Sequence, residues 1–128
     1  MVTVKDLYKQ TKQLMFEKSS STIYDNYLVG NLNLVLSELF EENNIARVFN
    51  GKTKLKEPQK LPETNYLNVE LIYEDEYINK VIPLGLAAQL FIDDDLNKYS
   101  IYMSKYNNAR VMAQKLISQK RYENASYE

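Results

Sequence analysis

The stretch VIPLGLAAQLFIDDDLNKY, from Val81 to Tyr99, decides how this chain folds. It begins with the most apolar run of the sequence, which carries a proline near its start. A proline inside a helix removes a hydrogen-bond donor and clashes with the preceding turn, which costs about 3 kcal/mol. The run therefore predicts a helix that kinks near Ile82 or restarts at Pro83. Its small residues allow another backbone to pack closely against it; they are Gly85, Ala87 and Ala88.

The apolar run ends in three consecutive aspartates, Asp93 to Asp95, which suit a metal site, a catalytic cluster or a helix cap. A calcium loop needs a turn glycine and a closing glutamate, and the residues after Asp95 are Leu-Asn-Lys-Tyr. A catalytic pair needs two carboxyl groups that face each other across a cleft. We therefore expect Asp94 or Asp95 to cap the helix that follows, with all three carboxylates at its positive end.

The composition excludes several classes of catalytic and metal-binding site. The chain has 128 residues, which predicts one domain, and it contains neither cysteine nor histidine. Thiolate and imidazole chemistry are therefore excluded, so the sequence predicts a protein that is not an enzyme and has no cofactor or metal. The net charge is −1, and no apolar run is long enough to span a bilayer. We expect a soluble intracellular protein with no membrane partner and no small-molecule substrate.

Two helices are predicted before residue 45. The first runs from about Val4 to Glu17 behind a capping pattern of Thr3 and Asp6. The second runs from about Ile23 to Glu42 and has a broad apolar arc. It also has a narrower apolar stripe, formed by Ile23, Tyr27 and Leu34. A helix with two apolar faces is either central to its own fold or contacts a partner.

The middle of the chain predicts extended structure. Asn-Gly between β-prone residues favours a hairpin, so we expect one at Ala46–Leu55 that turns at Asn50-Gly51. Leu67–Tyr73 alternates as a short strand does, or as a loop held by apolar anchors. A last helix, with tyrosines along its apolar arc, is predicted from about Leu96 to Lys120.

Together these elements predict a mainly α fold, a small bundle of about four helices. A β-hairpin or long loop, residues 45–73, is inserted between the second and third helices. Residues 1–120 form the single helical domain, and residues 121–128 form a flexible C-terminal tail.

The sequence contains two basic segments, and each of them suits two different roles. The segment with Lys52, Lys54 and Lys56 is a solvated arm that resists edge pairing, or it contacts DNA or an acidic partner. The charged residues from Lys98 to Arg121 are all basic. They complement phosphates at modest affinity, or they stabilise the C-terminal end of their own helix.

The order of these features resembles the head-to-tail connector, or adaptor, proteins of tailed bacteriophages. The resemblance rests on LSELFEENN, then IARVFNGKTKLKEP, an extended segment, and EDEYINKVIPLGLAAQLFIDDDLNKYSIYMSKYNNAR. Its most specific part is Pro83-x-Gly85-Leu-Ala-Ala, the acidic break and the spaced tyrosines Tyr102 and Tyr106. It covers Asn31 to Arg110 and leaves out the N-terminal helix and the tail.

The resemblance implies a virion structural protein of the neck, assembled in the bacterial host cytoplasm. Copies would form a closed, twelvefold ring beneath the portal protein, extend the DNA channel and support the next neck or tail component. DNA in the channel would be near, without specific contact. The residues predicted to meet partners are Ile23, Tyr27, Leu34, Lys52, Lys54, Lys56, Ile101, Met112, Lys115, Lys120 and Arg121.

A different class of protein also fits. A small phage assembly chaperone, or a regulatory protein that binds one partner and leaves, would show the same helices and the same exposed stripes. It would be a stable monomer or dimer and would be absent from finished particles. An enzyme has the least support, since it would need carboxylates with strongly shifted pKa values in a cleft.

Overall fold

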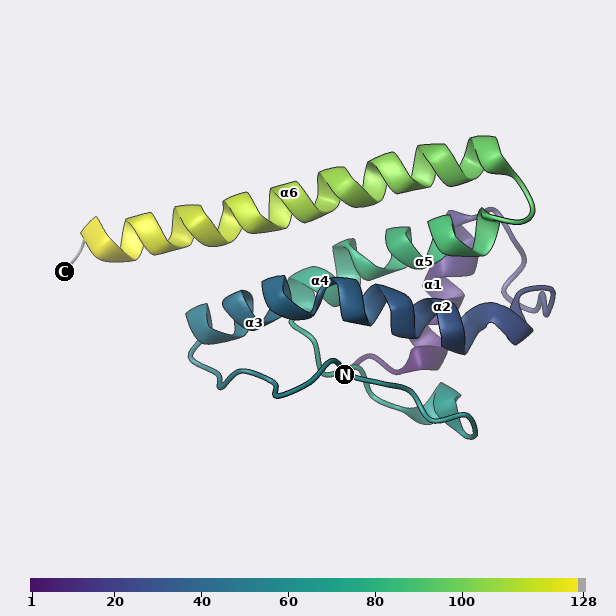
Figure 1. Cartoon of the computed structure of the whole chain (residues 1–128), viewed down its shortest axis with the longest axis horizontal. Coiled ribbons are helices and arrows are strands. Elements are labelled where there is room, and N and C mark those ends of the chain that lie inside the picture. The colour runs from purple at the N-terminus through teal and green to yellow at the C-terminus, as the bar shows by residue number, and fades with distance from the viewer. Residues whose placement is uncertain (127–128) are drawn as a thin grey trace.

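The helix α5, Ile82–Phe91, lies at the centre of the molecule, and nearly all of its residues are buried. The computed structural model describes residues 1–126 and the side chains of residues 1–119. In it α5 packs most extensively on α6, Leu96–Ser126, and then on α1, Val4–Leu14, and α2, Asp25–Glu38 (Figure 1). The prediction of a mainly α fold is confirmed.

The break before α5 lies where the proline predicts it. The short helix α4, Asp75–Lys80, ends at Val81, and α5 begins at Ile82. Pro83 falls in the first turn of α5, where its missing N–H has no helical partner to lose. The third predicted helix is therefore two helices, and the proline lies in the first turn of the second.

The contact of α5 with α6 depends on a glycine. Gly85 faces the ring of Tyr106, which is almost fully buried. Next to it, the rings of Phe91 and Tyr102 lie 5.4 Å apart between centroids, and the Tyr102 hydroxyl donates to the carbonyl of Leu14 at the end of α1. Tyrosines thus join the last helix to both α5 and α1.

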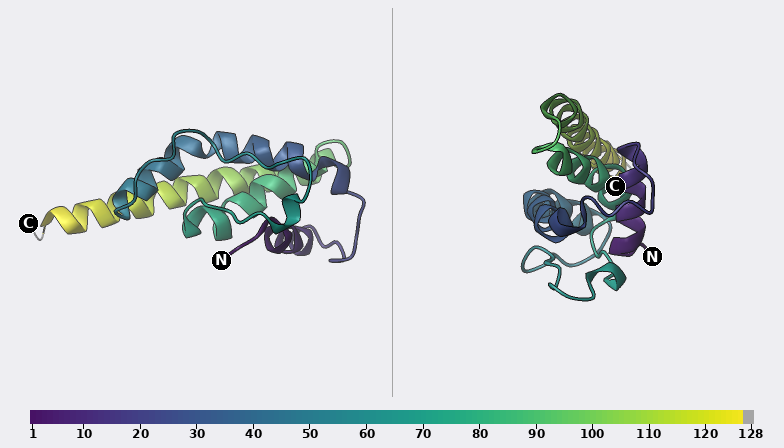
Figure 2. Two further views of the ribbon diagram at one scale, coloured as in Figure 1. Left: turned by 90° about the horizontal axis from the view of Figure 1, so that it is seen from below. Right: turned by 90° about the vertical axis from the view of Figure 1, so that its right-hand side faces the viewer.

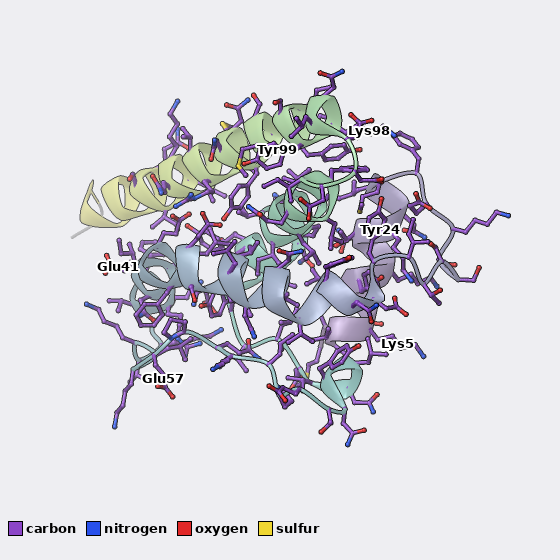
Figure 3. The ribbon with its side chains drawn as sticks, turned by 45° about the vertical axis from the view of Figure 1, so that its right-hand side comes forward. Lys5, Tyr24, Glu41, Glu57, Lys98 and Tyr99 are labelled. Atoms are coloured by element: carbon purple, nitrogen blue, oxygen red, sulfur yellow. The ribbon has the colours of Figure 1, made fainter. Side chains whose placement is uncertain are left out.

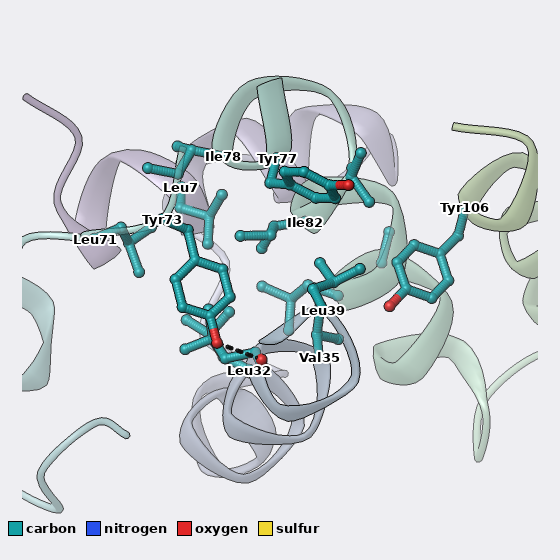
Figure 4. Close-up of a cluster of buried hydrophobic side chains, with 14 of the residues drawn as sticks. Leu7, Leu32, Val35, Leu39, Leu71, Tyr73, Tyr77, Ile78, Ile82 and Tyr106 are labelled. Carbon is teal, nitrogen blue, oxygen red and sulfur yellow. Dashed lines mark hydrogen bonds between the residues drawn. The ribbon is translucent and has the colours of Figure 1, made fainter. Parts of the chain in front are cut away.

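The core is continuous from α1 to α6. On one side of α5, Leu32 and Val35 of α2 and Leu39, which follows it, meet Ile82 (Figure 4). Tyr73 closes this cluster, and its hydroxyl donates to the carbonyl of Leu36 at 2.5 Å. The broad arc that the sequence predicts for the second helix is therefore its buried face.

The second predicted helix is longer than expected and consists of two pieces. α2 ends at Glu38, and α3, Phe40–Phe49, continues after a change of direction at Leu39. The amide N–H of Asn43 still donates to the carbonyl of Leu39, so the two helices form one bent arm. The arm therefore continues past the predicted end at Glu42.

The predicted β-hairpin at Ala46–Leu55 is wrong, because Asn50-Gly51 ends a helix. The N–H of Gly51 donates to the carbonyl of Val48, and that of Lys52 donates to Arg47 at 2.8 Å. Gly51 has φ +79°, the left-handed conformation that closes a helix in this way. A hairpin turn needs the same backbone at this glycine, so the dipeptide favours both structures equally.

After this turn the chain is a long loop, and side-chain amides hold it where strand pairing was expected. Asn44 exchanges hydrogen bonds with both backbone groups of Leu55, and Asn33 accepts from the N–H of Leu61. Gln59 donates to Glu70 and accepts from Ile72 in the same way. We call these three contacts the amide clasps.

The rest of the loop contains little regular structure. A short 3-10 helix, Tyr66–Asn68, is followed by a single antiparallel bridge between Thr3 and Glu70. Leu71 and Tyr73 are buried, whereas Leu67 is exposed. Residues 67–73 are thus a loop held by apolar anchors, which was the alternative to a strand.

α1 has the predicted capping box of Thr3 and Asp6 but ends early, at Leu14. The N–H of Glu17 donates to Lys12, and Phe16 takes the left-handed position with φ 61°. A bulky side chain rarely adopts this backbone, and Phe16 is 92% exposed. The strained residue therefore faces solvent.

α6 is the longest helix and projects past the rest of the bundle (Figure 1). It continues to Ser126, beyond the predicted end at Lys120. The predicted tail, residues 121–128, is thus helical through Ser126, and residues 127–128 lie outside the described residues. Figure 2 shows α3 on one side of α6 and α4 on the other.

Candidate interaction surfaces

The three aspartates have separate roles. Asp95 caps α6, since its Oδ1 accepts from the N–H of Lys98 at 3.1 Å, and the predicted cap is confirmed. Asp94 accepts from the Tyr24 hydroxyl at 3.0 Å, and Asp93 is exposed. Within the described residues, no group of three or more potential ligands is placed to hold a metal ion.

The Tyr24–Asp94 contact ties the start of α2 to the turn before α6. Burial, together with this hydrogen bond, raises the pKa of Tyr24 to about 12. The hydroxyl therefore keeps its proton at neutral pH and acts as a donor, not as a base.

A polar cluster joins α3 to α6. Arg110 Nη2 lies 2.7 Å from Glu42 Oε2, its Nε also donates to Glu42, and its guanidinium lies 5.4 Å from the centroid of the Tyr106 ring. The hydrogen bond to Glu42 raises the pKa of Arg110, and burial raises that of Tyr106. Both groups keep their protons at neutral pH, so the charged pair and the ring contact join α3 to α6 under these conditions.

A second polar cluster holds the start of the loop. Glu74 is buried, accepts from Asn50 at 2.8 Å and forms an ion pair with Lys52 at 2.9 Å. Burial would raise the pKa of Glu74, but the hydrogen bonds from Asn50 and Lys52 outweigh it and lower the pKa. Lys52 therefore has a partner inside its own subunit, whereas Lys54 and Lys56 are exposed on the loop.

The stripe predicted on the second helix faces solvent. Ile23, Tyr27 and Leu34 are 60%, 58% and 47% exposed. Ile23 and Tyr27 line a groove of about 350 Å³ against the end of α5, with Asp93 and Asp94 on its rim. Leu34 lines a larger groove, of about 760 Å³, between α2 and the loop.

The predicted residues of α6 are also exposed. Ile101 and Met112 are 53% and 64% exposed, and the Lys115 side chain is exposed as well. Met112 lines an apolar groove of about 280 Å³ between α6 and α4, together with Leu116 and Ala109. Lys120 and Arg121 lie on α6 beyond the side chains that the structure describes.

Two further exposed residues have no place in the sequence prediction. Leu116 of α6 is 38% exposed in the groove beside α4. Phe16 was placed inside the first helix and instead lies past its end. Neither exposure follows from helical spacing, because each depends on where a neighbouring helix ends.

The residues that the sequence predicts to meet partners do not form one surface in the structure. The stripe on α2 lies on the side of α3, and the groove with Met112 lies on the side of α4, which is the opposite side of α6 (Figure 2). Of the loop lysines, Lys56 lines the groove beside Leu34, and Lys52 pairs with Glu74. Figure 3 shows Tyr24 and Lys98 toward one end of the molecule and Glu41 and Glu57 toward the other.

No helix of the described part combines the length and the apolar character needed to cross a bilayer. Comparison of the chain with models of protein families, with curated proteins and with solved structures finds no match.

Proposed function

We propose that this protein is a non-enzymatic connector of a tailed bacteriophage, which forms a ring under the portal protein. The observation that supports this proposal is a pair of unlike apolar surfaces on opposite sides of one subunit. One is the stripe of Ile23, Tyr27 and Leu34, and the other includes Ile101 and Met112. A closed ring needs two different surfaces per subunit, because each copy contacts its neighbours in a head-to-tail manner.

The remaining surfaces fit the other roles of a connector. The exposed lysines Lys54 and Lys56 lie on a loop, where they could approach DNA without reading its sequence. The projecting end of α6 extends beyond the bundle, which suits contact with the portal or with the next neck or tail component.

The test is to count this chain in purified phage particles by quantitative mass spectrometry. The portal protein serves as the internal standard. The proposal predicts a copy number equal or simply proportional to that of the portal, because every ring position is filled. Absence from particles that contain portal and tail proteins would contradict it and would favour the assembly chaperone or regulator.

A further inference from the structure

The outward face of α2 is apolar and acidic. From Ser19 to Ala46 the chain has no lysine or arginine, and its charged residues there are all acidic. Glu41 is exposed just past the end of α2, and Asp93 lies on the rim of the groove that Ile23 and Tyr27 line. The end of the stripe around Ile23 and Tyr27 is thus bordered by negative charge, whereas the groove beside Leu34 also contains Lys56 and Lys60. We call this surface the acidic face.

One flank of α6 is apolar and basic. Ile101 and Met112 are about three helical turns apart, and Leu116 follows Met112 by about one turn. Their exposed side chains therefore lie along a single flank of α6. Lys105 and Lys115 lie on the same flank and are exposed. Glu76 and Lys80 of α4 complete the groove beside it. We call this surface the basic flank.

The two surfaces are suited to each other and not to themselves. Around Tyr27 the acidic face carries carboxylates, and around Met112 the basic flank carries mostly lysines, with Glu76 as the exception. Two acidic faces that met at Tyr27, or two basic flanks that met at Met112, would therefore repel at their edges. They lie on opposite sides of the subunit, with α3 and α4 on either side of α6 (Figure 2). Contact between unlike surfaces therefore leaves one of each free and allows the next copy to add.

We propose that the basic flank of one copy docks on the acidic face of the next, with Met112 against the stripe around Tyr27. The occupant of each surface is thus a second copy of this chain. The inference rests on the proposed ring and adds which surfaces form its subunit contact. Lys105 and Lys115 then lie near Glu41 and Asp93 of the neighbour, and the contact weakens as salt screens these charges.

Cysteine cross-linking tests the contact directly, because the chain has no cysteine of its own. Two variants, Tyr27→Cys and Met112→Cys, are oxidised separately and, in a parallel sample, after they have been mixed. The experiment is done both with concentrated protein and with phage particles. The proposal predicts disulfide-linked dimers only in the mixture, and a ladder of higher oligomers when one chain carries both substitutions. The matched control replaces Tyr27→Cys by Lys9→Cys, on the exposed surface of α1, and should give no link to Met112→Cys.

A charge exchange gives a second test that does not depend on cysteine geometry. Lys105→Glu with Lys115→Glu should abolish the cross-link, and so should Glu41→Lys with Asp93→Lys. All four substitutions in one chain should restore it, because the two surfaces have only exchanged sign. A dimer of Tyr27→Cys with itself, or no mixed link in either protein or particles, would overturn the docking. The particle count reports separately on the connector, which can hold even if this contact is wrong.

Discussion

The ring of Tyr106 occupies the space that a side chain at position 85 would need: a Cβ on Gly85 would lie 2.7 Å from Cε1 of Tyr106. This approach allows α6 to lie against α5, the most extensive helix contact of the fold. Tyr106 is 1% exposed, so its ring has little room to move aside.

Gly85→Ala should therefore lower the free energy of unfolding by about 1–3 kcal/mol, the usual effect of overpacking a core. Gly30→Ala is the matched control, since Gly30 is also helical and a Cβ there meets nothing within 4 Å. It should raise stability by about 0.5–1 kcal/mol because alanine favours the helix. Denaturant unfolding of both variants measures the difference, and equal effects would contradict the close contact.

Removal of Arg110 should leave the Glu42 carboxylate buried without its partner. We expect Arg110→Met to lower the free energy of unfolding by about 2–3 kcal/mol, less than for a fully buried pair because Arg110 is partly exposed. The further change Glu42→Gln in that variant should recover much of the loss. Asn108→Met, at an exposed position of the same helix, is the control and should change stability by less than about 0.5 kcal/mol. Thermal or denaturant unfolding distinguishes these outcomes.

Phe16→Gly should stabilise the fold, because glycine takes the left-handed conformation at little cost and the ring is exposed. The expected gain is about 1 kcal/mol. Phe16→Ala keeps the Cβ and should leave stability nearly unchanged. Equal destabilisation by both variants would contradict this expectation, because it would mean that the Phe16 ring contributes to packing.

The protein should lose stability in alkaline solution. Burial raises the pKa of Tyr73, and burial with the Asp94 hydrogen bond raises that of Tyr24, each to about 12 from 10.0. The raised pKa means that the unfolded chain loses these protons first, so the stabilisation is complete below pH 10 and falls between pH 10 and about 12.

Unfolding measured against pH, with tyrosinate absorbance followed in parallel, checks this expectation. Tyr24→Phe should weaken the dependence on pH in that window, since one of the responsible hydroxyls is absent. A loss of stability that is complete below pH 10 would show that other groups cause it.

The sequence predicted those helix ends that are determined by one residue and the turn beside it. Pro83 lies in the first turn of α5, Asp95 caps α6 and Thr3 caps α1, and each acts on the turn beside it. Helical spacing likewise separated the buried arc of α2 from its exposed stripe. These effects extend over one or two turns, and the sequence contains all that determines them.

Features that depend on distant segments could not be predicted. Asn50-Gly51 suits both a hairpin and a helix end, and the choice depends on the contacts of Asn50 and Lys52 with Glu74. The pair of Glu42 and Arg110 joins helices far apart in the chain, and neither position carries a local signal. Among the candidate surfaces, the opposite placement of the α2 stripe and the α6 flank became visible only with the fold.

The amide clasps make the fold of the subunit and the proposed contact between subunits respond differently to salt. Asn33, Asn44 and Gln59 are uncharged, so the hydrogen bonds that hold the loop respond little to ionic strength or to pH near neutrality. The docking that we propose between copies depends in part on charge and weakens in salt. Concentrated salt would therefore separate a ring into subunits that keep their fold, and removal of the salt would let the same subunits reassemble.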